Sequence, residues 1–297
     1  MIRLPSRYLA PFEAFTCYNS PYAAHDAACA IDLYLAGHRA ISPVAGEVVA
    51  IHRIRAPRRP YAREFDYVVA IDTDGGQDPI RDIASGEAMI ARILHLDPTV
   101  DVGEVVSVGQ QLGTLVRAGF FAPWVGNHLH VGFRGRGDDL LRAGGSRRLA
   151  LDVEVAPIHW DGHGAVVAAG RTYLEIEPPA SETDGDAWVG LASDEGWILD
   201  GGLPHYPHGG LVDRLTDGRR TAGPSETVHL LGSPVGTASG PTIDWADVTV
   251  RVNGKEATGI SLFCARSERY RIKIVFSDHN FAVGDKVTVS IEGDISS

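Results

Sequence analysis

The stretch Gly126-Asn127-His128-Leu129-His130-Val131-Gly132-Phe133 decides how the chain is best interpreted. Its alternation of apolar and other residues predicts a β-strand, in which successive side chains point to opposite faces. The three apolar residues Leu129, Val131 and Phe133 then face a core. His128 and His130 share the other face, where Gly132 leaves open space. Two imidazoles on one face suit a metal ligand and a catalytic partner. The alternative is a half-buried strand whose histidines have no function.

A second alternation near the N-terminus adds a carboxylate. One face of the expected strand is an apolar stripe that consists of Cys29, Ile31, Leu33 and Leu35. Asp32 lies on the opposite face, where its carboxylate could bind a metal ion. Alternatively, Asp32 binds no metal and is either buried with hydrogen-bonding partners or exposed to solvent. His25 lies seven residues upstream of Asp32, so a straight strand would point it to the wrong face. A turn or bulge around residues 26–28 is needed to bring it back.

Further segments extend the pattern in a fixed order. They are Ala40-Ile41-Ser42-Pro43-Val44-Ala45-Gly46-Glu47-Val48-Val49, then Ile93-Leu94-His95-Leu96, then Val102-Gly103-Glu104-Val105-Val106-Ser107-Val108-Gly109-Gln110, and finally Asn127-His128-Leu129-His130. With His25 and Asp32 before them, these segments resemble the M23 zinc peptidases, the lysostaphin- and LytM-like endopeptidases. The resemblance covers roughly residues 20 to 135. The early part departs from the family pattern, which would place the first histidine at Ala28.

The resemblance implies a fold, a cofactor and roles for named residues. The fold would be the antiparallel β-sheet of the duplicated hybrid motif. Zn²⁺ would be bound by His25, Asp32 and His130, while His95 and His128 would handle the proton and stabilise the developing oxyanion. The reaction would be hydrolysis of a peptide bond by a metal-activated water, with a peptide or a peptidoglycan-like polymer as substrate.

Composition limits the partners. The chain has 297 residues, which is enough for two domains or one large one, and its 44% hydrophobic content permits a proper core. Its formal net charge of -11 argues against nucleic acid as a partner. No apolar run approaches the roughly 20 residues of a membrane-spanning helix. Residues 1–8 lack the apolar segment of a signal peptide, and three cysteines do not indicate a disulfide framework. These features favour a cytoplasmic setting, unless the sequence is truncated.

The organisation expected along the chain is mainly β. Residues 1–150 are expected to form the M23-like zinc domain with a lead-in, residues 151–185 a β extension and linker, and residues 186–297 a smaller, antiparallel β-rich accessory module. A short helix is expected near Asp82–Met89, within a loop between two site strands. Helical periodicity is scarce elsewhere.

Other residues could carry chemistry. Cys29 could be a thiolate ligand, although its place on the apolar stripe favours a buried structural role. His159 and His163, and likewise His205 and His208, could bind metal or line a substrate groove, or could simply lie in turns. No Gly-x-Ser-x-Gly motif supports nucleophilic catalysis.

Two further functions stay open beside the hydrolase. One is an M23-like module that has lost its metal and binds a partner without catalysis. The other is a phosphohistidine carrier that uses His95 and one histidine of the His128–His130 pair. A lipoyl or biotinyl carrier, which attaches its cofactor to a lysine, is excluded for the region of resemblance, roughly residues 20 to 135, because no lysine precedes Lys255.

Overall fold

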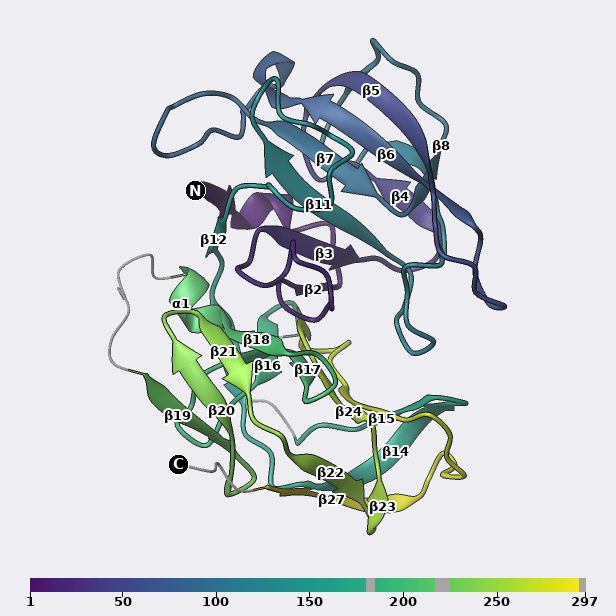
Figure 1. The fold of residues 1–297 in the computed structure, drawn as a ribbon, viewed down its shortest axis with the longest axis vertical. Helices are drawn as coiled ribbons and strands as arrows, with labels where there is room; N and C mark the ends of the chain where they lie inside the picture. The colour runs from purple at the N-terminus through teal and green to yellow at the C-terminus, as the bar shows by residue number, and fades with distance from the viewer. Residues whose placement is uncertain (180–184, 217–224, 294–297) are drawn as a thin grey trace. The chain divides into compact units, whose positions relative to one another are not determined.

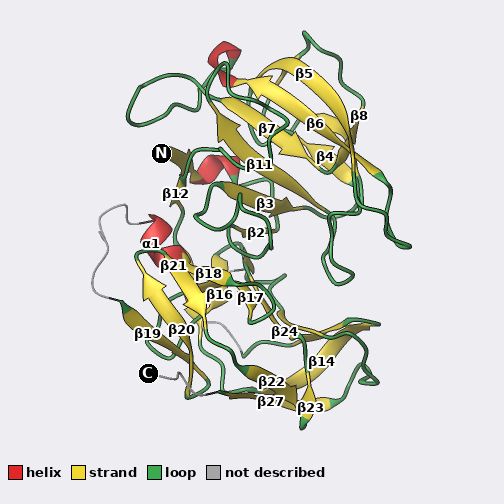
Figure 2. Cartoon of the chain, viewed as in Figure 1, coloured by secondary structure: helices red, strands yellow, loops and turns green. Residues whose placement is uncertain are grey.

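Short segments rich in β-branched and aromatic residues form strands along almost the whole chain (Figures 1 and 2). The structure is a computed structural model that describes residues 1–179, 185–216 and 225–293. The expected mainly β, two-part architecture is confirmed. Two compact units are present: Met1–Phe15, Tyr22–Ala24 and Ala28–Asp152 form the first, and Thr16–Pro21, His25–Ala27 and Val153–Ser297 the second.

Twelve strands fall within residues 1–152. They are β1 (Ile2–Pro5), β2 (Ala14–Thr16), β3 (Ala30–Tyr34), β4 (Arg39–Ile41), β5 (Gly46–Arg55), β6 (Phe65–Asp72), β7 (Ile90–Leu94), β8 (Leu96–Pro98), β9 (Val105–Val106), β10 (Gln111–Leu115), β11 (His128–Arg134) and β12 (Leu149–Asp152). Strands β3, β11, β7, β6, β5 and β9 are antiparallel neighbours in that order. A second sheet has the order β4-β10-β8, and β1 pairs with β12 in parallel.

The main sheet of the first unit has one apolar and one polar face in its centre. Its apolar face is buried almost completely and consists of Ile31 and Leu33 from β3, Leu129, Val131 and Phe133 from β11, Ile93 from β7 and Val69 from β6. Each of these large side chains contributes about 2 kcal/mol by leaving water. Because the side chains of a strand alternate, this burial fixes which residues of β3 and β11 point to the polar face.

The loop between β6 and β7 differs from expectation. The helix expected near Asp82–Met89 is not present; this segment forms a turn closed by an Arg81–Ala88 bridge. The Asp82 carboxylate accepts hydrogen bonds from the backbone N–H groups of Ala84 (2.8 Å) and Ser85 (3.4 Å). This turn does not continue as a helix, because Gly86 adopts a left-handed backbone (φ +72°) and donates its N–H to the Asp82 carbonyl at 2.8 Å.

The second unit is also built from strands. They are β13 (Val155–Ile158), β14 (His163–Gly170), β15 (Tyr173–Ile176), β16 (Trp188–Leu191), β17 (Leu199–Leu203), β18 (His208–Leu211), β19 (Glu226–Leu230), β20 (Ser233–Ser239), β21 (Thr242–Trp245), β22 (Thr249–Val252), β23 (Lys255–Glu256), β24 (Gly259–Leu262), β25 (Cys264–Arg266), β26 (Ile272–Val275) and β27 (Lys286–Glu292), with the short helix α1 (Val212–Thr216). Twelve of these strands form one sheet in the order β19-β20-β21-β18-β17-β24-β26-β15-β14-β27-β22-β23.

Apart from the two short N-terminal segments of the second unit, the boundary between the units follows Asp152, and strands β13 to β15 are counted with the second unit. Part of the expected linker, residues 180–184, lies outside the described residues. No helix in the described ranges is long and apolar enough to cross a membrane.

Candidate metal centre

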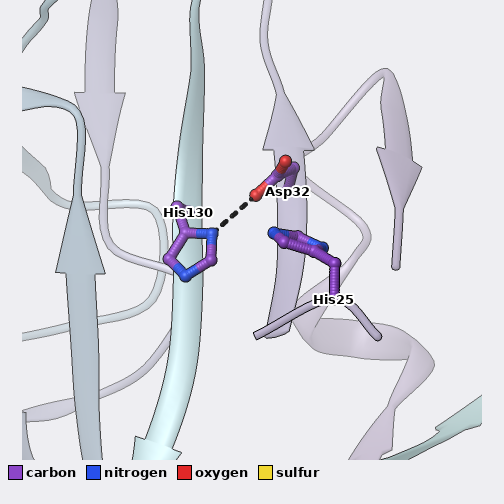
Figure 3. Close-up of side chains that lie close together, drawn as sticks. All are labelled: His25, Asp32 and His130. Carbon is purple, nitrogen blue, oxygen red and sulfur yellow. Dashed lines mark hydrogen bonds and ion pairs between the residues drawn. The ribbon is translucent and has the colours of Figure 1, made fainter. Parts of the chain in front are cut away.

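The register of two neighbouring strands brings Asp32 and His130 together. The two residues lie directly opposite each other in the β3–β11 pair, on the polar face of the sheet. Side chains at such positions have Cβ atoms about 5 Å apart and therefore interact. His130 Nδ1 donates to Asp32 Oδ1 at 2.9 Å; the dashed line in Figure 3 marks this bond. The Asp32 carboxylate is almost completely buried, at 4% exposure.

His25 reaches the same place from the turn that precedes β3 (Figure 3). The turn is closed by a hydrogen bond from Cys29 N to Ala24 O (3.0 Å), and Ala28 has a left-handed backbone, with φ of +51°. This turn compensates for the unusual spacing between His25 and Asp32, because His25 does not need to share the alternation of β3. The His25 ring is buried, and its Nδ1 donates to the Cys17 carbonyl at 2.8 Å.

His25, Asp32 and His130 form a group that could hold a metal ion. Each offers one ligand atom, and these atoms lie within 4.8 Å of one another. Ligand atoms around a tetrahedral zinc ion with bonds of about 2.0–2.1 Å lie about 3.3 Å apart, so modest side-chain movements suffice. Two imidazoles and one carboxylate are ordinary ligands for zinc and several other first-row metals. The bond from His25 Nδ1 to a carbonyl is the support that metal-binding histidines usually have, because it leaves Nε2 for the metal.

His128 lies two residues before His130 on β11 and therefore on the same face of the sheet. Its Nδ1 donates to the Gly126 carbonyl at 2.9 Å, and its Nε2 is 3.4 Å from Asp32 Oδ2. The ring is buried and stacks on Phe121, with centroids 4.5 Å apart and planes at 15°. His128 therefore has a fixed orientation beside the group, with Nε2 as the nitrogen that faces it.

His95 also joins this face, although strand alternation alone would point it away. In β7, Leu94 shares the polar face with His130, so the next residue should face the core. His95 instead has a left-handed backbone, with φ of +72°. This conformation costs a non-glycine residue on the order of 1 kcal/mol, and such residues cluster at functional sites. The His95 ring centroid is 5.1 Å from that of His128 and 5.9 Å from that of His130.

The residue that holds His95, Asp66 at the start of β6, was missed in the sequence. Asp66 has no exposed surface. Its Oδ2 accepts a hydrogen bond from His95 Nδ1 at 2.5 Å, and its Oδ1 accepts from His95 N at 2.9 Å. The sequence does contain one signal for Asp66: it alternates in phase with apolar residues of β6. An acidic residue that is buried among apolar ones needs a hydrogen-bonding partner.

Aromatic residues cover the histidines from the loop before β11. Phe121 is buried and meets the His95 ring edge-on at 4.6 Å. Tyr61 donates its hydroxyl to the Phe121 carbonyl (3.1 Å), and Tyr22 donates to the Phe120 carbonyl (3.0 Å). The rings of Tyr22 and Tyr61 are themselves exposed. The loop thus presents an aromatic surface next to His95 and His128.

Two buried arginines also lie on the polar face of the sheet. Arg92 on β7 donates to the Leu140 carbonyl at 2.6 Å, and Arg134 on β11 donates to the Asp139 carbonyl, also at 2.6 Å. Burial, assisted by the positive charge of Arg134, lowers the pKa of Arg92 to about 10, so it stays protonated at neutral pH. These bonds anchor the loop after β11.

The remaining candidates do not join this group. Among the described residues, the group that could hold a metal ion does not include Cys29, His159, His163, His205 or His208. His163 Nδ1 is bonded to Thr288 Oγ1 at 3.0 Å, and His208 Nδ1 to an Asp244 carboxylate oxygen at 2.7 Å. Burial lowers the pKa of His205 to about 4, which keeps this residue neutral.

Comparison with known proteins identifies a family. The N-terminal domain of DUF8155, described as a domain of unknown function, matches residues 3–151, and the C-terminal domain of the same family matches residues 156–292. No curated protein sequence matches the chain. Neither description names a peptidase, so the resemblance to M23 enzymes stays a prediction. Because the N-terminal match alone covers half of the sequence, the chain belongs to the DUF8155 family.

Proposed function

We propose that this protein is a zinc-dependent hydrolase that cleaves amide bonds in peptides, in the manner that its resemblance to M23 peptidases implies. One observation supports this most: the donor atoms of His25, Asp32 and His130 converge beside two further oriented histidines, His95 and His128. A module that only binds a partner needs no such set, and a phosphohistidine carrier has no use for Asp32 at its centre.

Zinc fits these residues. Catalytic zinc sites use three protein ligands, often two or three histidines with a carboxylate, and keep a further position open. When bound, zinc lowers the pKa of a bound water towards about 7 and polarises a carbonyl oxygen. In this chain His25, Asp32 and His130 would hold the ion. The buried Asp32 carboxylate would supply the negative charge that makes binding of a divalent cation favourable in a site away from water.

The two other histidines have complementary tasks in the proposed reaction. His95, whose Nδ1 is bonded to Asp66, accepts at Nε2 the proton of the attacking water and returns it to the leaving amine. His128 Nδ1 already donates to the Gly126 carbonyl, so Nε2 carries a proton only when the ring is an imidazolium. In that form, with the Asp32 carboxylate 3.4 Å away, Nε2–H would donate to the oxyanion that forms on the scissile carbonyl. Water is consumed, the C–N bond breaks, and the products are a carboxylate and an amine.

The surroundings of the histidines favour a peptide as substrate. The exposed rings of Tyr22 and Tyr61 and the neighbouring Phe120 offer flat apolar surface for peptide side chains or sugar rings. Within this class we propose a peptide or a peptidoglycan-like polymer. The exposed part of this aromatic surface lies on the loops next to the catalytic histidines.

The test is cleavage of defined peptides by the zinc-loaded protein, followed by mass spectrometry. The substrates are glycine-rich peptides, peptides with mixed sequence and soluble peptidoglycan fragments. We expect His128→Ala to keep zinc but to lose turnover by about 10²-fold or more, as for other general acid–base or oxyanion groups. His163→Ala, a histidine of the second unit bonded to Thr288, is the matched control and should cleave like the wild type.

Two results would contradict the proposal. Loss of zinc from His128→Ala as complete as from Asp32→Ala would show that the division of roles is wrong. Binding of these polymers by the zinc-loaded wild type without any cleavage would favour a binding module.

A further inference from the structure

We propose that Asp66 is the positioning residue of this site: it turns His95 onto the polar face and fixes the tautomer in which Nε2 has a free lone pair. The catalytic consequence rests on the proposed hydrolase function. The assignment of the tautomer does not, and can be tested on the protein without metal.

The contacts of Asp66 leave little freedom for His95. Both carboxylate oxygens are used: Oδ1 accepts from the backbone N–H groups of His95 (2.9 Å) and Tyr67 (2.7 Å), and Oδ2 accepts from His95 Nδ1 (2.5 Å). A carboxylate with no exposed surface is stable only when its oxygens are bonded in this way. An ionised carboxylate can only accept hydrogen bonds, so the His95 proton is on Nδ1.

Asp66 also accounts for the backbone conformation of His95. Asp66 precedes Val68 by two residues on β6, and Val68 is paired with Leu94, so Asp66 lies on the polar face next to the end of β7. The bond from His95 N to Asp66 holds the chain at this point, where φ is +72°. The same carboxylate thus binds the main chain and the side chain of one residue, which fixes both the location and the rotation of the ring.

This arrangement has a defined chemical effect. Because Nδ1 is occupied, Nε2 is the nitrogen left to take a proton, and Phe121 packs edge-on against the ring at 4.6 Å. When Nε2 accepts a proton, the ring becomes an imidazolium, and the Asp66 carboxylate stabilises this charge at Nδ1. No other reactant is needed: the proton that arrives from water leaves with the amine.

The first test is ¹⁵N NMR of histidine-labelled, metal-free protein at pH 8, with His95 assigned through His95→Gln. We expect the wild type to show the tautomer protonated at Nδ1. An Nε2-protonated His95 in the wild type would overturn the proposal, whatever the protein catalyses.

The second test uses Asp66→Asn. The amide oxygen of asparagine can keep the two backbone bonds, but its NH₂ group donates to Nδ1 and drives the proton to Nε2. We expect the other tautomer, unchanged zinc content and KM, and a fall in kcat of about 10⁴-fold, the size seen when this exchange is made in a catalytic triad. Asp72→Asn is the matched control, since Asp72 lies on the same face of β6 but pairs with Arg136.

The outcomes separate the two proposals. An Asp66→Asn protein that is folded and keeps both the wild-type tautomer and the wild-type kcat would refute the role of Asp66. If Asp66→Asn fails to fold, the tautomer of the wild type decides. If the zinc-loaded wild type cleaves none of the peptides, the proposed hydrolase fails, while the tautomer measurement still tests Asp66.

Discussion

Asp200, a buried carboxyl on β17, is expected to make the stability of the second unit depend on pH. It has no exposed surface, and burial raises its pKa from 3.8 to about 7. The hydroxyl of Thr16 donates to Oδ1, and the backbone N–H groups of Cys17 (2.6 Å) and Tyr18 (3.3 Å) donate to Oδ2. Asp200 therefore holds the segment whose Cys17 carbonyl accepts the Nδ1 proton of His25.

The sign and size of the effect follow from this pKa. Below about pH 4, Asp200 is neutral in the folded and the unfolded chain. Between about pH 4 and 7 the unfolded chain releases the proton first, so the free energy of unfolding falls as the pH rises. A rise from 3.8 to about 7 corresponds to about 4 kcal/mol at 1.36 kcal/mol per pKa unit, and this stability is absent above pH 7.

The perturbation is Asp200→Asn, which resembles the protonated carboxyl: one oxygen accepts the two backbone bonds and the NH₂ group faces Thr16. We expect the variant to match the wild type at pH 4 and to be more stable by up to about 4 kcal/mol at pH 8. Urea unfolding followed by tryptophan fluorescence measures this, because four of the five tryptophans belong to the second unit. An equal difference between the two proteins at both pH values would show that the pKa of Asp200 is not raised on folding.

Two further predictions concern the first unit. Phe121→Ala should lower the free energy of unfolding by about 3 kcal/mol, because it removes a buried ring stacked on His128; a loss below about 1 kcal/mol in urea unfolding would contradict this packing. The space beside Gly132 is occupied by Ser146, contrary to the open space expected from the sequence. Gly132→Ala should therefore cost about 1 kcal/mol, because the new Cβ would lie 2.6 Å from Ser146 Oγ and 3.2 Å from Ser146 Cβ. Adding Ser146→Gly should restore stability by the same assay, and a single variant as stable as the wild type would disprove the clash.

Much of the site could be predicted because strand alternation determines faces. The apolar residues of β3 and β11 are buried, so Asp32, His128 and His130 had to share the other face, as the alternation predicts. The direct pairing of His130 with Asp32 could not be predicted. It depends on which strands become neighbours and in which register, and this is decided by contacts distant in sequence.

The rest of the site depends on exceptions to alternation. His95 reaches the polar face through one left-handed residue, and His25 reaches it from a turn outside β3. Single dihedral angles of this kind leave no periodic signal. Asp66 was missed because a lone acidic residue at the start of a strand usually faces solvent. Only the tertiary structure shows that it is buried against His95.

The zinc content of the purified protein, measured by elemental analysis, tests the proposed metal centre directly. Wild type and Asp32→Ala are prepared side by side after incubation with zinc. We expect about one zinc ion per wild-type chain and none in Asp32→Ala, because the variant removes the carboxylate at the centre of the group. A wild-type chain that takes up no zinc, or an Asp32→Ala variant that keeps it, would rule out a zinc centre formed by His25, Asp32 and His130.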